Sequence, residues 1–175
     1  MKKLWMFVSI VCLCMSFSAV GLAHSMTVAE MSIGGIAPQS TFGYVKQVYG
    51  LPSVSDVQTY NQKNGQTIRI AYIYNTILVF SGITHHWAGK EDDELIYHIS
   101  CRANNLLTPS GFTRGTKYND VVKKFGAGDL LDPKSIHNAI DGCKYYDYVV
   151  NDQAMTFAVD KEGIVCEITI DMYNK

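Results

Sequence analysis

The chain of 175 residues carries 15 lysine and arginine residues against 16 aspartate and glutamate residues, and 47% of its residues are hydrophobic. Without the first 23 residues, which hold two lysines, the formal charge is about −3 and no basic stripe is present, which argues against nucleic acid as a partner. The remaining span of about 150 residues is long enough to bury a core without metal or disulfide staples.

The N-terminal segment has the three parts of a secretory signal peptide. Lys2 and Lys3 form a positive region, residues 4–20 are an apolar run interrupted by serines, and residues 21–23 supply the small side chains that signal peptidase reads. The apolar run is short for a transmembrane helix. We expect cleavage after Ala23, an extracytoplasmic (periplasmic or secreted) location, and no stable membrane span after cleavage. An uncleaved N-terminal anchor is the alternative.

Residues 35–50 and residues 111–126 share one pattern of a small polar residue, apolar residues at steps of three and four, and a final glycine. The spacing predicts a short amphipathic helix in each segment. Ser40 and Thr116 are the expected N-caps, and the final glycines are the expected helix stops.

Three β-rich runs follow each predicted helix. They are residues 68–74, 76–81 and 95–101 in the first half, and residues 144–150, 155–159 and 164–172 in the second. We therefore predict an α+β fold made by tandem duplication of a unit of one helix and a three-stranded antiparallel sheet, with the helices packed on one sheet face. The expected division is a signal peptide over residues 1–23, a first repeat over 24–105 and a second repeat over 106–175.

Alternation of apolar and polar residues assigns the two faces of the predicted sheets, because successive strand residues point to opposite sides. The residues expected to face the helices are Tyr97, Ile99, Cys101, Ile164, Cys166, Ile168, Ile170 and Met172. The residues expected on the open face are Arg69, His98, Ser100, Arg102, Asp147, Glu167, Thr169 and Asp171.

Residues 36–45 and 49–52, with the degenerate copy that ends at Gly126, resemble the helix motif of the SmpA/OmlA (BamE-like) family of envelope proteins. Two such units in tandem resemble the β-lactamase inhibitor protein (BLIP)-like fold. The resemblance implies a binding scaffold that acts through its open sheet and loops. The second copy departs from the motif, since residues 127–128 are Ala-Gly where the first copy has Leu-Pro.

A histidine pair and an acidic run in the loop of residues 82–94 form the nearest approach to a metal-binding pattern. His85 and His86 are adjacent, and neighbouring side chains in extended structure point apart, so we expect no metal. Trp87 beside them is a candidate anchor for a partner.

Cys101, Cys143 and Cys166 remain after the leader is removed. Three is an odd number, so at most one disulfide closes, and the sequence does not choose the pair. A cysteine nucleophile, Cys143 or Cys101, would need one of His85, His98 or His137 as its base, but no local catalytic signature accompanies these cysteines. We expect no enzyme activity and no cofactor.

The sequence thus predicts an exported, non-enzymatic binding protein whose partner is another envelope or extracellular protein. The candidate partner-binding residues are Arg69, His86, Trp87, His98, Tyr145 and Asp147. A small-molecule or metal binder using the 82–94 loop and an unrecognised hydrolase are the alternatives. The oligomeric state, the disulfide state and inhibition of an enzyme stay open.

Overall fold

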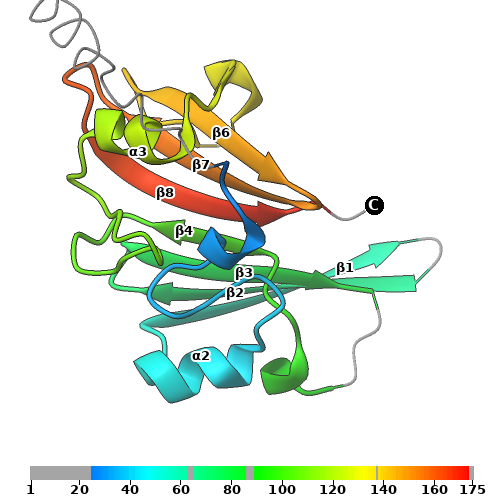
Figure 1. Cartoon of the computed structure of the whole chain (residues 1–175). Helices are drawn as coiled ribbons and strands as arrows, with labels where there is room; N and C mark the ends of the chain where they lie inside the picture. The colour runs from blue at the N-terminus through cyan, green and yellow to red at the C-terminus, as the bar shows by residue number, and fades with distance from the viewer. Residues whose placement is uncertain (1–24, 63–64, 86–88, 137, 174–175) are drawn as a thin grey trace, which may run out of the picture.

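The computed structural model describes residues 25–62, 65–85, 89–136 and 138–173, and their main feature is one antiparallel sheet of eight strands (Figure 1). The strand order across the sheet is β1-β2-β3-β4-β8-β7-β6-β5. The bounds are β1 Val54–Gln62, β2 Gly65–Tyr74, β3 Leu78–Thr84, β4 His98–Cys101, β5 Asp129–Leu131, β6 Lys144–Val150, β7 Gln153–Val159 and β8 Val165–Met172.

This sheet shows that the predicted fold class is wrong. The prediction was two repeated units of one helix and three strands, whereas the strands form a single sheet joined where β4 pairs with β8. Ile99 lies opposite Ile170 and Ser100 lies opposite Thr169 at this junction. Sequence patterns mark strands but not their neighbours, and this pairing joins segments far apart in the chain.

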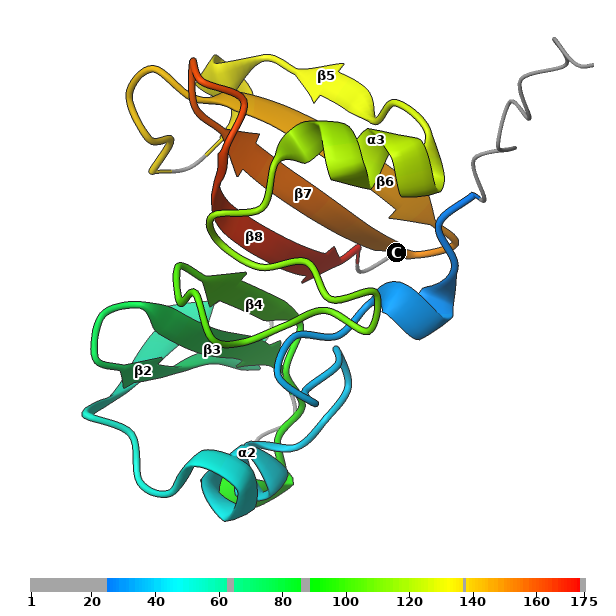
Figure 2. The same ribbon diagram turned by 60° about the vertical axis from the view of Figure 1, so that its left-hand side comes forward.

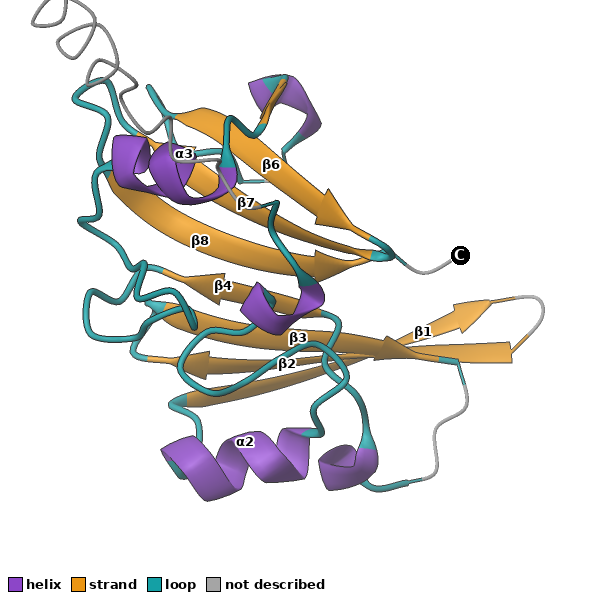
Figure 3. Ribbon diagram, viewed as in Figure 1, coloured by secondary structure: helices purple, strands orange, loops and turns teal. Residues whose placement is uncertain are grey.

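The two strands that the sequence did not predict, β1 and β5, are the edges of the sheet. Figure 3 labels β1, and Figure 2 labels β5. Alternation is weak there because the edges bury little. In β1, Val54 is 51% exposed and Val57, on the other face, is 43% exposed. In β5, which has three residues, Leu130 is 64% exposed. Neither strand has the apolar face by which a half-buried strand is recognised.

Two short α-helices accompany the sheet in the described part of the chain, α2 (Phe42–Tyr49) and α3 (Tyr118–Phe125). Both end at a glycine with positive φ, as predicted. The predicted caps are wrong by one residue. Thr41, not Ser40, accepts the Tyr44 N–H at 3.1 Å. Lys117 precedes α3 without a side-chain cap, since Thr116 Oγ1 accepts from Thr113 N instead.

The main core lies between one face of the sheet and the two helices. Phe42 of α2 meets the ring of Tyr72 edge to face at 4.5 Å between centroids, and Phe125 of α3 meets Tyr148 at 6.3 Å. An N-terminal segment that includes the 3-10 helix η1 (Val28–Glu30) runs along the same side of the sheet as the helices (Figure 2). It buries Met26, Met31, Ile33 and Ile36 in this core.

Part of the predicted face assignment is wrong because of a β-bulge between β7 and β8. Ala158 lies opposite Glu167, but Val159 lies opposite Val165, so β8 holds an additional residue there. Val165 is fully buried in the main core, and Cys166 packs in a second cluster instead. Cys166 therefore does not face the helices, contrary to the prediction.

The inward assignment of Ile168 and Ile170 is confirmed, because both side chains are buried in the main core. Near β4, Ile99 and Cys101 are also in this core as predicted. Just before β4, however, Ile96 is the buried residue, and Tyr97 does not pack into the core.

None of the helices in the described residues has the length and apolar character needed to cross a bilayer. The predicted signal peptide lies outside the described residues.

Candidate functional site

The face of the sheet that the helices leave uncovered carries a groove with a volume of about 570 Å³. Most of its floor consists of polar side chains from β2, β3, β4, β7 and β8, with Val79 of β3 among them. One wall comes from the connection between β5 and β6, through Ser135, Ile136 and Asn138. The groove therefore spans the β4–β8 junction at the middle of the sheet.

A carboxylate on β8 organises the centre of the groove. The Glu167 side chain is only 9% exposed. Its Oε1 accepts hydrogen bonds from Ser100 Oγ at 2.5 Å and from Arg102 Nε at 3.2 Å, while Oε2 accepts from Arg102 Nη2 at 3.4 Å. The forked contact with the guanidinium compensates the desolvation of the carboxylate and fixes both side chains.

A second pair lies beside the first on the same two strands. His98 Nδ1 and Asp171 Oδ1 are 2.6 Å apart, and the two residues are direct cross-strand partners. The carboxylate orients the imidazole, so that its other nitrogen is turned away from Asp171. Ser81 of β3 is the cross-strand neighbour of His98 on the other side. No hydrogen bond joins these two side chains in the described structure.

Asp147 lies on the open side of β6 but is buried, with 5% of its surface exposed. Thr156 Oγ1 of β7 donates to its carboxylate at 2.8 Å. Burial raises the pKa of Asp147 because a charged carboxylate loses its hydration, and the Thr156 hydrogen bond opposes this shift. In this structure Asp147 therefore hydrogen-bonds to the neighbouring strand β7 and is largely shielded from solvent.

The wall of the groove is anchored to the sheet by a small second core on the open side. This cluster consists of Cys143, Tyr145 and Ala158, with Leu131, Ile136, Ala139, Ile140 and Cys166 packed against them. The Tyr145 hydroxyl accepts the Ile140 N–H, which holds the connection before β6 against the strand. Ile136 of the wall thus both packs on this cluster and lines the groove.

The structure brings three of the predicted contact residues into the groove. Arg69, His98 and Tyr145 line it. Asp147 lies on the same side of the sheet but is buried, and it does not line the groove. Its predicted role in partner binding stays a prediction. His86 and Trp87 lie outside the described residues.

Sequence reasoning missed the pairing that gives the groove its chemistry. Alternation placed Ser100, Arg102, Glu167 and Asp171 on the open face, but none was singled out as a site residue. The signal that identifies them is the register of β4 against β8, which brings residues from opposite halves of the chain together.

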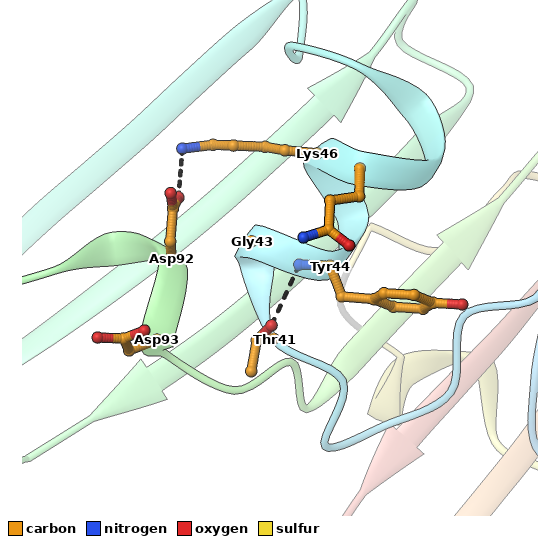
Figure 4. Close-up of a pocket in the computed structure, with 7 residues that line it drawn as sticks. Thr41, Gly43, Tyr44, Lys46, Asp92 and Asp93 are labelled. Atoms are coloured by element: carbon orange, nitrogen blue, oxygen red, sulfur yellow. Dashed lines mark hydrogen bonds and ion pairs between the residues drawn. The ribbon is translucent and has the colours of Figure 1, made fainter.

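A shallower depression of about 490 Å³ lies between α2 and the 3-10 helix η2 (Glu91–Asp93) (Figure 4). Lys46 Nζ is 2.5 Å from Asp92 Oδ1 and 3.9 Å from Glu91 Oε2, and it stands 5.1 Å from the centroid of the Tyr72 ring. The hydrogen bond to Asp92 raises the pKa of Lys46 above its ordinary value. The acidic residues of the 82–94 loop thus bind a lysine that fastens η2 to α2.

Within the described residues, no three histidine, cysteine, aspartate or glutamate side chains gather closely enough to hold a metal ion. His85 Nδ1 lies 3.0 Å from Thr67 Oγ1 instead of turning toward the acidic run.

No protein-family model and no curated protein matches the chain. Among solved structures, it is similar to a DUF4309 family protein (YjgB) from Bacillus subtilis, with 14% identity, a TM-score of 0.42, and coverage of 75% of this chain and 78% of that one. It is also similar to an extracellular protein containing an SCP domain from Bacillus anthracis, with 14% identity, a TM-score of 0.47, and coverage of 86% and 46%. The uncharacterized protein YfeY from Escherichia coli is a third, with 12% identity, a TM-score of 0.45, and coverage of 84% and 99%.

The chain spans less than half of the Bacillus anthracis protein. None of these three proteins is named as a SmpA/OmlA or BLIP-like protein. The likenesses are too weak to assign a function.

Proposed function

We propose that this chain is an extracytoplasmic, non-enzymatic binding protein that receives a segment of another envelope or extracellular protein in the groove on its open sheet face. The observation that carries the proposal is the set of hydrogen-bonded polar and charged side chains at the β4–β8 junction, on the side that the helices leave uncovered. Glu167 and Asp171 are each fixed by a basic partner, so the floor presents a preorganised polar surface.

The lining of the groove suits a polypeptide partner. Val79, Ile136 and Tyr145 supply apolar and aromatic contact area among the charged and hydroxyl side chains. Arg69 is exposed at the groove and has no ionic partner among the described residues, so its guanidinium is available to a carboxylate. The signal-like character of residues 1–23 supports the extracytoplasmic location.

The test is affinity capture from an envelope and extracellular fraction with the exported, tagged protein as bait. The baits are the wild-type chain, Arg69→Ala, His98→Ala and the control Lys161→Ala, whose side chain is 86% exposed at the turn before β8. We expect one protein that the wild type and the Lys161 variant retain and that both groove variants lose. Identical captured sets from all four baits would refute binding through the groove.

A second candidate, hydrolysis of an ester or amide, rests on the His98–Asp171 pair with Ser81 as the cross-strand neighbour of the histidine. A carboxylate-oriented imidazole next to a hydroxyl is the arrangement that activates a nucleophile. Ser100 is unsuited to this role because its hydroxyl already donates to Glu167. Turnover of ester substrates that His98→Ala and Ser81→Ala both abolish would support hydrolysis, and no turnover by the wild type would remove it.

A further inference from the structure

The two edges of the sheet differ in how well they are protected against pairing with a further strand. An edge strand exposes a row of backbone N–H and C=O groups, which proteins commonly shield with short strands, charges or proline. β5 has three residues, begins at Asp129 and is followed closely by Pro133. β1 has nine residues, none of which is proline, lysine or arginine, and Asp56 is its only charged residue. β1 is therefore the unprotected edge.

The hydrogen-bond pattern identifies the backbone groups of β1 that point away from the sheet. The Ile73 carbonyl of β2 accepts the Ser53 N–H, so the backbone of Ile73 faces β1. Val54 is the cross-strand partner of Ile73, and antiparallel pairs alternate between facing toward and facing away from each other. The residues that alternate with those bonded to β2 direct their backbone groups outward: Ser55, Val57 and Thr59. In the described part of the chain, no strand or loop backbone bonds to them on that outer side.

The side chains of this edge do not oppose the approach of a second strand. Val57 lies on the helix side of the sheet, because its cross-strand partner Ile70 is buried in the main core, and it is 43% exposed. Asp56 and Gln58 share the opposite side, where Gln58 Nε2 donates to Asp56 Oδ2 at 2.8 Å. The edge thus combines an apolar side chain on one face with a carboxylate bound to an amide on the other.

The sequence of β1 is complementary to itself about Val57. When two copies of the strand lie antiparallel with Val57 opposite Val57, Ser55 lies opposite Thr59 and Asp56 lies opposite Gln58. These pairs join apolar to apolar, hydroxyl to hydroxyl and carboxylate to amide groups, and the two Asp56 carboxylates are not opposite each other. In this register the outward-facing residues meet one another, so their free N–H and C=O groups can bond between the copies.

We propose that the protein forms a two-fold symmetric dimer in which the β1 strands of two copies pair antiparallel about Val57. A second copy is the occupant that fits, because β1 supplies both sides of a matched, isologous interface and every copy carries an edge of the same length. The proposal concerns the oligomeric state, which the sequence left open.

Pairing of this kind would join the two sheets into one continuous sheet. Cross-strand partners share a face, so the open sides of both copies would lie on the same side of the dimer, each with its own groove. Two linked grooves would raise the avidity for a partner that carries two copies of the bound segment. The dimer itself does not depend on the proposed partner binding.

The test is sedimentation velocity of the purified exported chain over a wide range of concentration. Val57→Lys places two ammonium groups opposite each other at the two-fold axis, and Leu130→Lys is the matched control on the other edge, where Leu130 is 64% exposed. We expect a dimer fraction that rises with concentration for the wild type and Leu130→Lys, and a dissociation constant at least about tenfold higher for Val57→Lys. A wild type that stays monomeric throughout, or a dimer that Val57→Lys leaves intact, would overturn the proposal.

A cross-linking measurement tests the register. The Cα atoms of a backbone-bonded antiparallel pair are about 5.5 Å apart, which a disulfide can span. Oxidation of Val57→Cys should therefore give a covalent dimer that the wild type, with its own three cysteines, does not give. Cysteine is close to valine in size, so this variant reports on the interface even if Val57→Lys unfolds. No covalent dimer from Val57→Cys, or a larger yield from Gln58→Cys, would contradict pairing about Val57.

Discussion

Replacing Arg102 with alanine tests whether the charge network at the β4–β8 junction stabilises the fold that carries the groove. The change removes two of the three hydrogen bonds to the Glu167 carboxylate, whose side chain is 9% exposed. A hydrogen bond to a charged group contributes about 1.5–3 kcal/mol. The Arg102 side chain is 42% exposed, so solvent screens the pair, and we expect a lower loss of about 1–2 kcal/mol in the free energy of unfolding.

The assay is a double-mutant cycle of urea unfolding with Arg102→Ala, Glu167→Gln and the double variant. Glutamine keeps an acceptor for Ser100 but removes the charge that the guanidinium meets. For a protein of this size, the single Arg102 change corresponds to a fall in melting temperature of about 3–6 °C. We expect a coupling energy of about 1 kcal/mol between the two positions.

A coupling energy below about 0.3 kcal/mol would show that the two side chains act independently and would refute the reasoning. Lys161→Ala is the matched control, because it removes a cationic side chain that is 86% exposed. It should leave the unfolding midpoint unchanged. If it lowers the midpoint as much as Arg102→Ala does, the effect belongs to net charge and not to the junction.

Three further outcomes are expected. Because burial raises the pKa of Asp147, the folded state holds its proton more tightly than the unfolded state, so stability falls as pH rises through that pKa. Asp147→Asn should therefore be more stable than the wild type at neutral pH and lose this advantage in acid, and equal urea midpoints at every pH would contradict the assignment. Thr41→Ala should cost about 1 kcal/mol while Ser40→Ala costs little, since Thr41 caps α2; equal losses in urea unfolding would argue against that cap. Gly82→Ala should destabilise severely, because a Cβ there would overlap the Leu95 carbonyl oxygen, and an unchanged melting temperature would disprove this close approach.

The sequence by itself determined the local elements of this protein. The glycines that end α2 and α3, the six strands with an apolar face, and the inward direction of Ile99 and Ile168 all follow from short-range patterns. Each depends on a residue and its near neighbours in the chain, such as a glycine that adopts positive φ or an alternation of period two.

The prediction of the site residues also depended on short-range patterns. Alternation put His98 and Arg69 on the open face, and both line the groove. It also put Asp147 there, but this side chain is buried, and its hydrogen-bond partner Thr156 lies on the neighbouring strand β7, which a pattern within β6 does not report. The exposed edge strands escaped prediction for a related reason, because little of their surface is buried.

Only the tertiary structure decided how the two halves meet and what the groove contains. The joining of β4 to β8 made one sheet of two predicted ones, and a single additional residue near Ala158 reversed the face of Cys166. The ion pair of Arg102 with Glu167 and the hydrogen bond of His98 with Asp171 exist because of that register. Backbone hydrogen bonds between strands are the same for every residue type, so strand partners are selected by the packing of the whole core, which a local sequence pattern does not encode.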